Sequence, residues 1–511
     1  MSKRPSLKIN AISNWTSLVV QVAVGFFLTP FVISYLGRSG YGIWTLVGSF
    51  IGYYGLLNLG IGSAITRYIA RYAAQKDDKR LNETANTALA MFCVTGLLAI
   101  LISFLVAAPL AHFFKVPSEK VNAFKHIVWA LGIATGLSFP SGVFSAMITA
   151  REHFVAVNVV NITATLLRAV LTVAILLAGY GLAGIAYPTL AATVVSLIAV
   201  FFLVKSVMPE FRIRLAHARL ATLKMLLVYG GYTTIISVAD ILRMKIDSIV
   251  IGKMIGLAEV GIYGVAALLV SYMLRLVVSG MGILTPRFAA LDGAGHADEL
   301  RDTFLRSLSI SSFIACGAAL MALLFGRAFI LLWVGPGFEG AIPVLGILAV
   351  SYAVALSQTP GIGLLYAVNK HRYYAAVTMA EAIANLLLSI LLARLYGIIG
   401  VALGTAIPMF VVKLLVQPIY VSRVAGIRFK DYVKAIGSAL VTSMAIIIMQ
   451  SFLVTYLNIC LIESNSYFLL GIGASVTGAI YFVLNCLFSP TIRRIILSFM
   501  AKSCGHLSIR L

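Results

Sequence analysis

Four charged side chains stand close together in a stretch that is otherwise apolar enough to cross a bilayer. The stretch ADILRMKIDSIVIG, residues 239–252, contains Asp240, Arg243, Lys245 and Asp247. A charge at mid-bilayer depth costs about 2.5 to 3.5 kcal/mol on insertion scales, so such residues mostly face protein or water. We therefore predict that these side chains line a polar site or pair with neighbouring helices.

The spacing of these charges places three of them on one side of a helix. At about 100° per residue, Asp240, Arg243 and Asp247 fall in one narrow sector, whereas Lys245 points away from it. The stripe reads minus, plus, minus, and Arg243 can pair with Asp247 four residues on. We expect the stripe to face a cleft or a neighbouring helix, and Lys245 to extend toward the membrane surface.

Other charges also lie deep in predicted spans, and the positive ones outnumber the negative ones. Arginine offers parallel donors to phosphoryl oxygens, so a cleft with surplus positive charge suits an anionic cargo. The candidate substrate-binding residues are Arg275, Arg243, Arg168, Lys413 and Lys245. The alternative is that the same charges form ion pairs that hold helices together.

The deep carboxylates allow two interpretations. Asp240, Asp247 and Glu381 could bind a coupling proton or sodium ion, or could only neutralise the nearby cations. The seven histidines and five cysteines show no spacing typical of a metal site. We therefore expect no cofactor and no metal.

The composition predicts an all-α polytopic membrane protein. Of the 511 residues, 61% are hydrophobic and only 11% are charged, which would leave a water-soluble protein with too little polar surface. Apolar windows between charged connectors predict about fourteen transmembrane helices. The expected spans are 10–34, 41–66, 84–110, 124–149, 156–179, 182–204, 226–251, 257–285, 305–332, 341–367, 374–394, 397–420, 435–459 and 467–488.

The net charge of +22 is explained by membrane topology. Most lysines and arginines fall in connectors on the side that holds both termini, so we predict that both termini are cytoplasmic. Attraction to anionic lipid headgroups adds to this, and no nucleic-acid partner is needed. The connector 205–225 is expected to be a basic surface helix or a solvated linker.

Two glycine-rich segments recur along the chain. LGRSGYGIW (36–44) resembles IGLAEVGIY (255–263), and YGLAGIA (180–186) resembles YGIIGVA (396–402), at nearly the same offset and between equivalent spans. We predict two pseudosymmetric six-helix bundles, a geometry typical of alternating-access transporters. The expected organisation is an N-terminal bundle at 1–204, the linker at 205–225, a C-terminal bundle at 226–420, and two further helices with a basic tail at 421–511.

Three sequence blocks carry a family resemblance: FLTPFVISYLGRSGYGIWTLV, GYYGLLNLGIGSAITRYIARY and DSIVIGKMIGLAEVGIYGVAALL. They resemble the Wzx-type oligosaccharide and polysaccharide flippases of the MOP exporter superfamily, which also contains MATE drug transporters and lipid II flippases. The resemblance implies that the chain moves an undecaprenyl-pyrophosphate-linked O-antigen, exopolysaccharide or capsule unit to the periplasmic leaflet. It also implies a polysaccharide polymerase and a chain-length regulator as partners. Many relatives have Asp at the position of Asn58, so no carboxylate role is assigned there.

Two other functions compete with the flippase. A MATE-like cation or drug antiporter would use a carboxylate in the first bundle, but the acids of that half lie in connectors or at span edges. A membrane polymerase or ligase would need sizeable outer loops, whereas the outer connectors here are short. The sequence has no nucleotide loop, hydrolase elbow or metal motif, so we predict a transporter with no catalytic residues.

Overall fold

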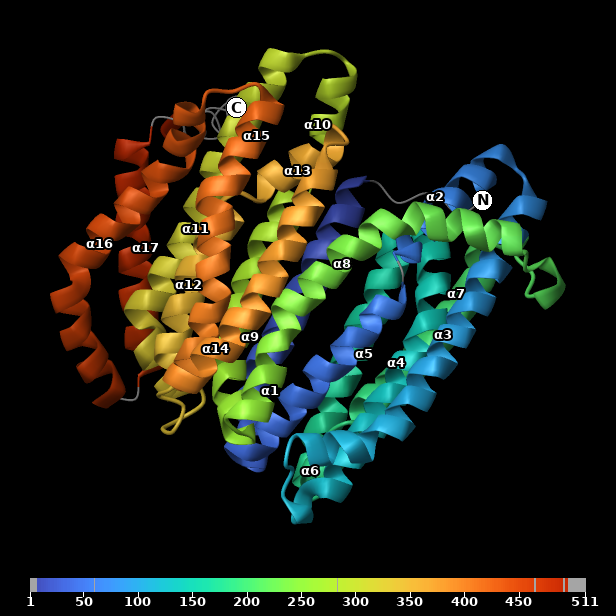
Figure 1. Ribbon diagram of the computed structural model, residues 1–511, viewed down its shortest axis with the longest axis horizontal. Coiled ribbons are helices and arrows are strands. Elements are labelled where there is room, and N and C mark those ends of the chain that lie inside the picture. Colours follow the sequence, from blue (N-terminus) through green and yellow to red (C-terminus); the bar gives the residue numbers. More distant parts are fainter. Residues whose placement is uncertain (1–6, 59, 283, 464–465, 490–491, 495–511) are drawn as a thin grey trace, which may run out of the picture. The chain divides into compact units, whose positions relative to one another are not determined.

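The computed structural model describes residues 7–58, 60–282, 284–463, 466–489 and 492–494, and every regular element in these ranges is a helix (Figure 1). Eleven helical segments of this part are long and apolar enough to cross a membrane. The predicted all-α polytopic fold is confirmed, while the count of fourteen spans stays a prediction. Most of the basic tail predicted after the last span lies outside the described residues.

The chain packs into two compact units, Met1–Gly261 and Ile262–Leu511, which we describe separately. The division falls just after the start of α9, whereas the sequence analysis placed the boundary in the connector 205–225. The predicted pair of six-helix bundles therefore stays a prediction.

Unit 1 contains the first eight α-helices and three short 3-10 turns. These elements are α1 (Leu7–Gly52), η1 (Tyr53–Asn58), α2 (Ile61–Gln75), α3 (Asp78–Phe113), η2 (Ser118–Lys120), α4 (Val121–Ala150), α5 (Phe154–Leu177), α6 (Gly181–Gly184), α7 (Tyr187–Val207), η3 (Leu215–His217) and α8 (Leu220–Met254).

Unit 2 contains the remaining helices, with α9 beginning at the boundary. These are α9 (Leu257–Met281), α10 (Leu284–Gly293), α11 (Ala297–Trp333), α12 (Ala341–Ser357), α13 (Thr359–Ala367), α14 (His371–Val411), the π-helical turn η4 (Val412–Val416), α15 (Gln417–Ala425), α16 (Phe429–Glu463) and α17 (Tyr467–Phe488).

Glycines bend the two longest helices where the sequence predicts turns between spans. Gly37 in α1 has φ 64° and Gly397 in α14 has φ 58°, left-handed conformations that glycine adopts without a steric penalty. Beyond Gly397 the two halves of α14 pack against each other, and Asn385 donates a hydrogen bond to Thr405 at 3.0 Å. A Cβ atom on Gly404 would lie 2.4 Å from Ser389 Oγ, so the halves touch closely.

Helices α3 and α4 of unit 1 also approach each other through glycines. A Cβ atom on Gly136 would lie 2.7 Å from the Gly96 carbonyl oxygen and 2.6 Å from Ile100 Cγ1. Small residues allow such close backbone contact between membrane helices.

This contact gives a prediction with a matched control on the same helix. Gly136→Ala is expected to destabilise the protein by about 1 to 3 kcal/mol, because the methyl group overpacks the contact. Gly142→Ala should be neutral or stabilising, because nothing lies within 4 Å of its Cβ position and alanine favours the helix. Thermal unfolding in detergent compares the two variants, and equal melting temperatures would contradict the prediction.

The core of unit 2 is built around α11. One cluster includes Phe288, Phe304 and Tyr432, which join α10 and α16 to α11. A second includes Leu320 and Tyr481, which join α17 to it. These side chains are almost fully buried, so α11 is the helix that positions its neighbours.

The connector between α7 and α8 is neither a surface helix nor a solvated linker. Its residues 208–219 contain only the short turn η3, and the rest is non-helical. Side chains of α3 hydrogen-bond its backbone, for example Asn86 to Arg212 and Arg214. The two predicted forms are therefore wrong, because the segment is docked on unit 1.

Candidate functional site

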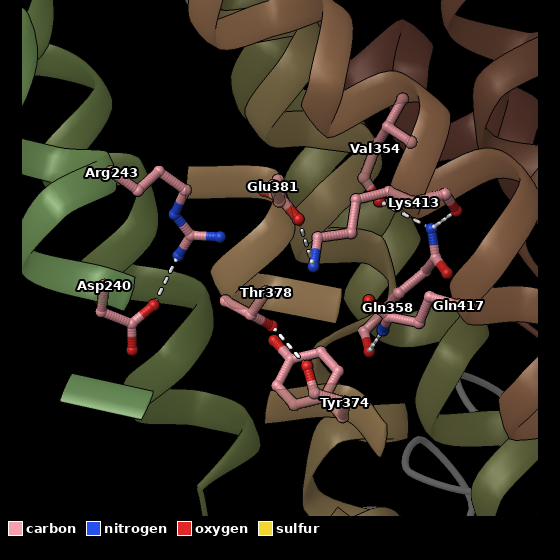
Figure 2. Close-up of polar contacts among 9 residues, drawn as sticks. All are labelled: Asp240, Arg243, Val354, Gln358, Tyr374, Thr378, Glu381, Lys413 and Gln417. Carbon is pink, nitrogen blue, oxygen red and sulfur yellow. Dashed lines mark hydrogen bonds and ion pairs between the residues drawn. The ribbon is translucent and has the colours of Figure 1, made fainter. Parts of the chain in front are cut away.

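The charged stripe of α8 contains an ion pair between Arg243 and Asp240. Arg243 Nη2 donates to Asp240 Oδ1 at 2.9 Å, with i,i+3 spacing (Figure 2). The Arg243 side chain is 13% exposed, whereas that of Asp240 is 47% exposed. Asp247 is buried and Lys245 is half-buried. The stripe therefore contains an ion pair between Arg243 and Asp240, and the predicted pairing of Arg243 with Asp247 stays a prediction.

A polar cavity of about 240 Å³ lies beside Asp240. Its lining residues are Gly55, Leu56, Asn58, Gly60, Thr234, Ser237, Asp240 and Ile241. A carboxylate, an amide and two hydroxyl groups border the cavity, and Arg243 neutralises the carboxylate. The space holds about eight water molecules at roughly 30 Å³ each, and hydrogen-bonding groups of these types suit a polyhydroxyl ring.

Local sequence explains why there is room beside α8. The helical path of α1 ends at Gly52, and the segment YYGLLN continues as the tighter turn η1 before α2 begins. Gly55 in this turn has no side chain, and a Cβ atom there would lie 3.3 Å from Ile241 Cδ1. The helix break thus leaves a cavity between η1 and α8.

In unit 2, Lys413 and Glu381 form a buried ion pair. Lys413 Nζ lies 3.5 Å from Glu381 Oε2, and the side chains are only 2% and 1% exposed (Figure 2). The ammonium group also lies 5.2 Å from the centre of the Tyr374 ring, a cation–π distance. The two groups come from opposite sides of the bend at Gly397, so the fold of α14 and η4 brings them together.

Glutamines complete the polar network around the buried pair. Gln358 donates its amide to the carbonyl oxygens of Val354 and Lys413, and accepts a hydrogen bond from the Tyr432 hydroxyl at 3.0 Å. Gln417 donates to the Gln358 carbonyl oxygen at 3.3 Å. Buried amides that are bonded in this way hold the helix backbone in one arrangement.

The π-helical turn η4 has a cause in the sequence. Pro418 lacks an N–H group and its ring crowds the carbonyl four residues earlier, at Leu414. The helix widens over Val412–Val416, and a wide turn of this kind often marks a functional site. Lys413 lies in the widened turn, which points its side chain at Glu381 (Figure 2).

The other predicted cations are not members of these two ion pairs. Arg168 on α5 and Arg275 on α9 are exposed, and Arg275 forms no ion pair with any described residue. Lys245 packs beside Gly52, whose Cβ position is 3.2 Å from Lys245 Cε. The structure thus joins Arg243 to Asp240 and Lys413 to Glu381, and leaves Arg275 available.

A second cavity, of about 250 Å³, lies within unit 2 and is apolar. Helices α9, α11, α12 and α17 contribute its lining, which includes Met273, Met321, Phe325, Phe329 and Leu470. Flexible methionine and flat aromatic side chains adapt to irregular apolar ligands.

A search of the sequence for charged residues does not find the uncharged polar residues of the two sites. Asn58, Thr234 and Ser237 border the cavity on α8, and Gln358 and Gln417 surround the buried pair. Each stands in a mostly apolar sequence, so a search for amides and hydroxyls within spans finds them.

Sequence comparisons match the chain to a family of polysaccharide biosynthesis proteins. The family model described as a polysaccharide biosynthesis protein matches residues 23–343. The uncharacterized membrane protein EpsK of Bacillus subtilis (strain 168) is 24% identical over 440 residues, 84% of this chain and 85% of the relative. A candidate O-antigen transporter of Shigella flexneri is 20% identical over 415 residues, 80% of this chain and 97% of the relative.

Solved structures share the fold. The lipid II flippase MurJ in an inward closed conformation has a TM-score of 0.68 and 14% identity, over 96% of this chain and 99% of that chain. An inward-facing MATE multidrug resistance transporter of the MOP superfamily also has a TM-score of 0.68, with 17% identity over 81% of this chain and 99% of that one. The family model spans well over half of the 511 residues, so the predicted resemblance is confirmed and the chain belongs to the polysaccharide biosynthesis protein family.

Proposed function

We propose that the chain is a flippase, not an enzyme, which moves an undecaprenyl-pyrophosphate-linked oligosaccharide from the cytoplasmic to the periplasmic leaflet of a bacterial inner membrane. Both termini are cytoplasmic in this proposal, and the cargo crosses by alternating access through a cationic central cavity. Membership of a polysaccharide biosynthesis family and the fold shared with MurJ support it. A polymerase and a chain-length regulator would act on the exported unit.

The observation that carries the proposal is the polar cavity beside the Asp240–Arg243 pair. The cavity brings the hydrogen-bonding side chains of Asn58, Thr234, Ser237 and Asp240 around one space, and none of these side chains is buried, so each can reach a polar ligand. Arg243 holds one oxygen of Asp240, and the exposed part of the carboxylate can accept hydrogen bonds from sugar hydroxyls. We assign this cavity to one sugar ring of the cargo.

The pyrophosphate needs cations rather than a neutral cavity. Arg275 is exposed and forms no ion pair within the described ranges of the chain, so it is the strongest candidate, and Arg168 is exposed in unit 1. Arg243 and Lys245 are the next candidates for binding the pyrophosphate. Lys413 can contact a phosphate only when its ion pair with Glu381 opens. Arginine can give each phosphoryl group two parallel hydrogen bonds.

The isoprenoid chain and the energy source complete the proposal. The apolar cavity of unit 2 offers space to part of the isoprenoid tail, while the rest stays in lipid. Proton or sodium coupling would use a carboxylate that can exchange its partner, and Glu381, Asp240 and Asp247 are the candidates.

Reconstituted vesicles test the proposed function. Wild-type protein should transfer fluorescent undecaprenyl-pyrophosphate-linked oligosaccharide, prepared from the native host, between leaflets, and a membrane-impermeant quencher reports the transfer. Export of a cationic dye with no lipid transfer would instead favour the MATE-like antiporter. Elongation of the glycan would favour a polymerase or ligase.

The sugar cavity has a test of its own. Asp240→Asn and Ser237→Ala are expected to weaken binding of the lipid-linked oligosaccharide about tenfold each, because one hydrogen bond to a charged or polar group is lost. Binding of bare undecaprenyl pyrophosphate should not weaken, since it has no sugar and Asp240→Asn removes a negative charge beside Arg243. Titration of purified protein with the two lipids separates them, and equal loss for both lipids would contradict the assignment.

A further inference from the structure

Two asparagines of α3 hold the connector between α7 and α8. Asn82 Nδ2 donates to the Glu210 carbonyl oxygen at 3.1 Å, and the Arg212 N–H donates to Asn82 Oδ1 at 2.8 Å. Asn86 repeats the pattern, donating to the Arg212 carbonyl oxygen at 2.9 Å and accepting from the Arg214 N–H at 2.8 Å. Bonding at alternate residues is the pattern of an extended chain, so the asparagines act like a neighbouring strand.

Helix and strand dimensions explain this fit. Four residues of an α-helix advance about 6 Å, and two residues of an extended chain advance about 6.6 Å. Amides at i and i+4 of α3 therefore meet every second residue of the connector. Asn82 and Asn86 are 7% and 1% exposed, and each also donates to a carbonyl of α3. Backbone bonds thus fix the connector, and its side chains are left for other contacts.

Three consecutive side chains of the connector are exposed. Phe211 is buried, whereas Arg212, Ile213 and Arg214 are exposed. Residues two apart in an extended chain point to the same face, so the two arginines lie on one face of the connector.

Acidic groups beside the connector are already occupied. Glu210 forms an ion pair with Arg151, and Glu83 pairs with Arg219 at 3.2 Å. Within the part of the chain that the structure describes, Arg212 and Arg214 have no carboxylate partner. Two exposed arginines are therefore carried by a fixed stretch of backbone, without a carboxylate partner among the described residues.

We propose that Arg212 and Arg214 bind anionic phospholipid headgroups. The connector follows α7, which is apolar enough to cross a membrane, and precedes the span predicted from the sequence at 226–251. It is therefore expected to lie where headgroups begin, on the predicted cytoplasmic side. Arginine matches phosphate oxygens with parallel donors, and clustered cations next to a membrane helix attract anionic lipid. Exposed Ile213 (48%) and Leu220 (81%) supply apolar side chains that can contact acyl chains.

Native mass spectrometry of the full-length protein in detergent tests this site by titration with phosphatidylglycerol and with phosphatidylcholine. The double variant Arg212→Gln/Arg214→Gln should bind phosphatidylglycerol about thirtyfold more weakly, since each cation near a lipid surface contributes roughly a factor of five. The matched control is Lys79→Gln/Arg80→Gln, which removes two exposed charges from the start of α3. The control should bind like wild type.

Each other outcome overturns the proposal. Equal loss in both double variants would mean that net charge attracts the lipid without a defined site. Unchanged binding in the Arg212 and Arg214 variant would place the lipid elsewhere. Displacement by millimolar inorganic phosphate would identify a site for free anions, and equal binding of phosphatidylcholine would show that the headgroup charge is irrelevant. Retained elution volume on size exclusion confirms that the variants are folded.

Discussion

A variant with Lys413→Met is expected to lose most of its folded yield in detergent. Methionine is similar in shape to lysine, so the main change is that the buried carboxylate of Glu381 loses its ion pair with Lys413. Removing one partner of a buried ion pair costs about 3 to 5 kcal/mol, because the remaining charge stays desolvated. Fluorescence-detected size exclusion after heating gives the melting temperature, which should fall sharply relative to wild type.

The double variant Lys413→Met/Glu381→Leu is the informative control. An apolar pair of similar volume is often as stable as the ion pair it replaces, so the double variant should recover most of the lost stability. A double variant as unstable as Lys413→Met would contradict the assignment, because the cost would then come from lost packing. With the fold recovered, transfer in vesicles under imposed pH and sodium gradients tests coupling. If Glu381 couples, the double variant should no longer respond to the gradient that drives wild type.

Most of the helices and their turns could be predicted, because apolar runs and glycines are local signals. Gly37 and Gly397 bend their helices at the expected turnarounds. To predict the pairing of Lys413 with Glu381, the fold-back of the helix at Gly397 must also be taken into account. Gly397 stands sixteen residues after Glu381 and sixteen before Lys413, so a helix that folds back at this glycine brings the two residues to the same depth.

Contacts made by uncharged side chains were harder to predict. The spacing of Asn82 and Asn86 is visible in the sequence, but helical residues at i and i+4 usually face another helix. Nothing in the local sequence shows that a non-helical connector more than 120 residues later lies against them.

The ion pair between Arg243 and Asp240 was also hard to predict, because it depends on tertiary packing. The spacings of Arg243 to Asp240 and to Asp247 both allow an ion pair on a helix, and packing around α8 decides which carboxylate stays accessible.

Arg275→Ala is expected to abolish most lipid transfer while leaving the fold intact. Arg275 is exposed and has no carboxylate partner among the described residues, so its removal leaves no buried charge behind. Hydrogen bonds to a charged group contribute about 1.5 to 3 kcal/mol, so loss of one pyrophosphate contact should lower transfer by a factor of about ten to a hundred. Arg275→Lys should recover only part of this, since an ammonium group lacks the parallel donors of arginine.

Arg287→Ala supplies the matched control in the same unit. Arg287 is an exposed arginine of α10 that pairs with Glu299, and it lies close to the helix end rather than within a long apolar run. Its removal changes net charge by the same amount, so any effect of overall charge on lipid recruitment appears in both variants. The assignment predicts normal transfer for Arg287→Ala and strongly reduced transfer for Arg275→Ala. A normally folded Arg275→Ala protein that transfers lipid at the wild-type rate would remove Arg275 from the pyrophosphate site, and Arg168 would then be the exposed arginine to test.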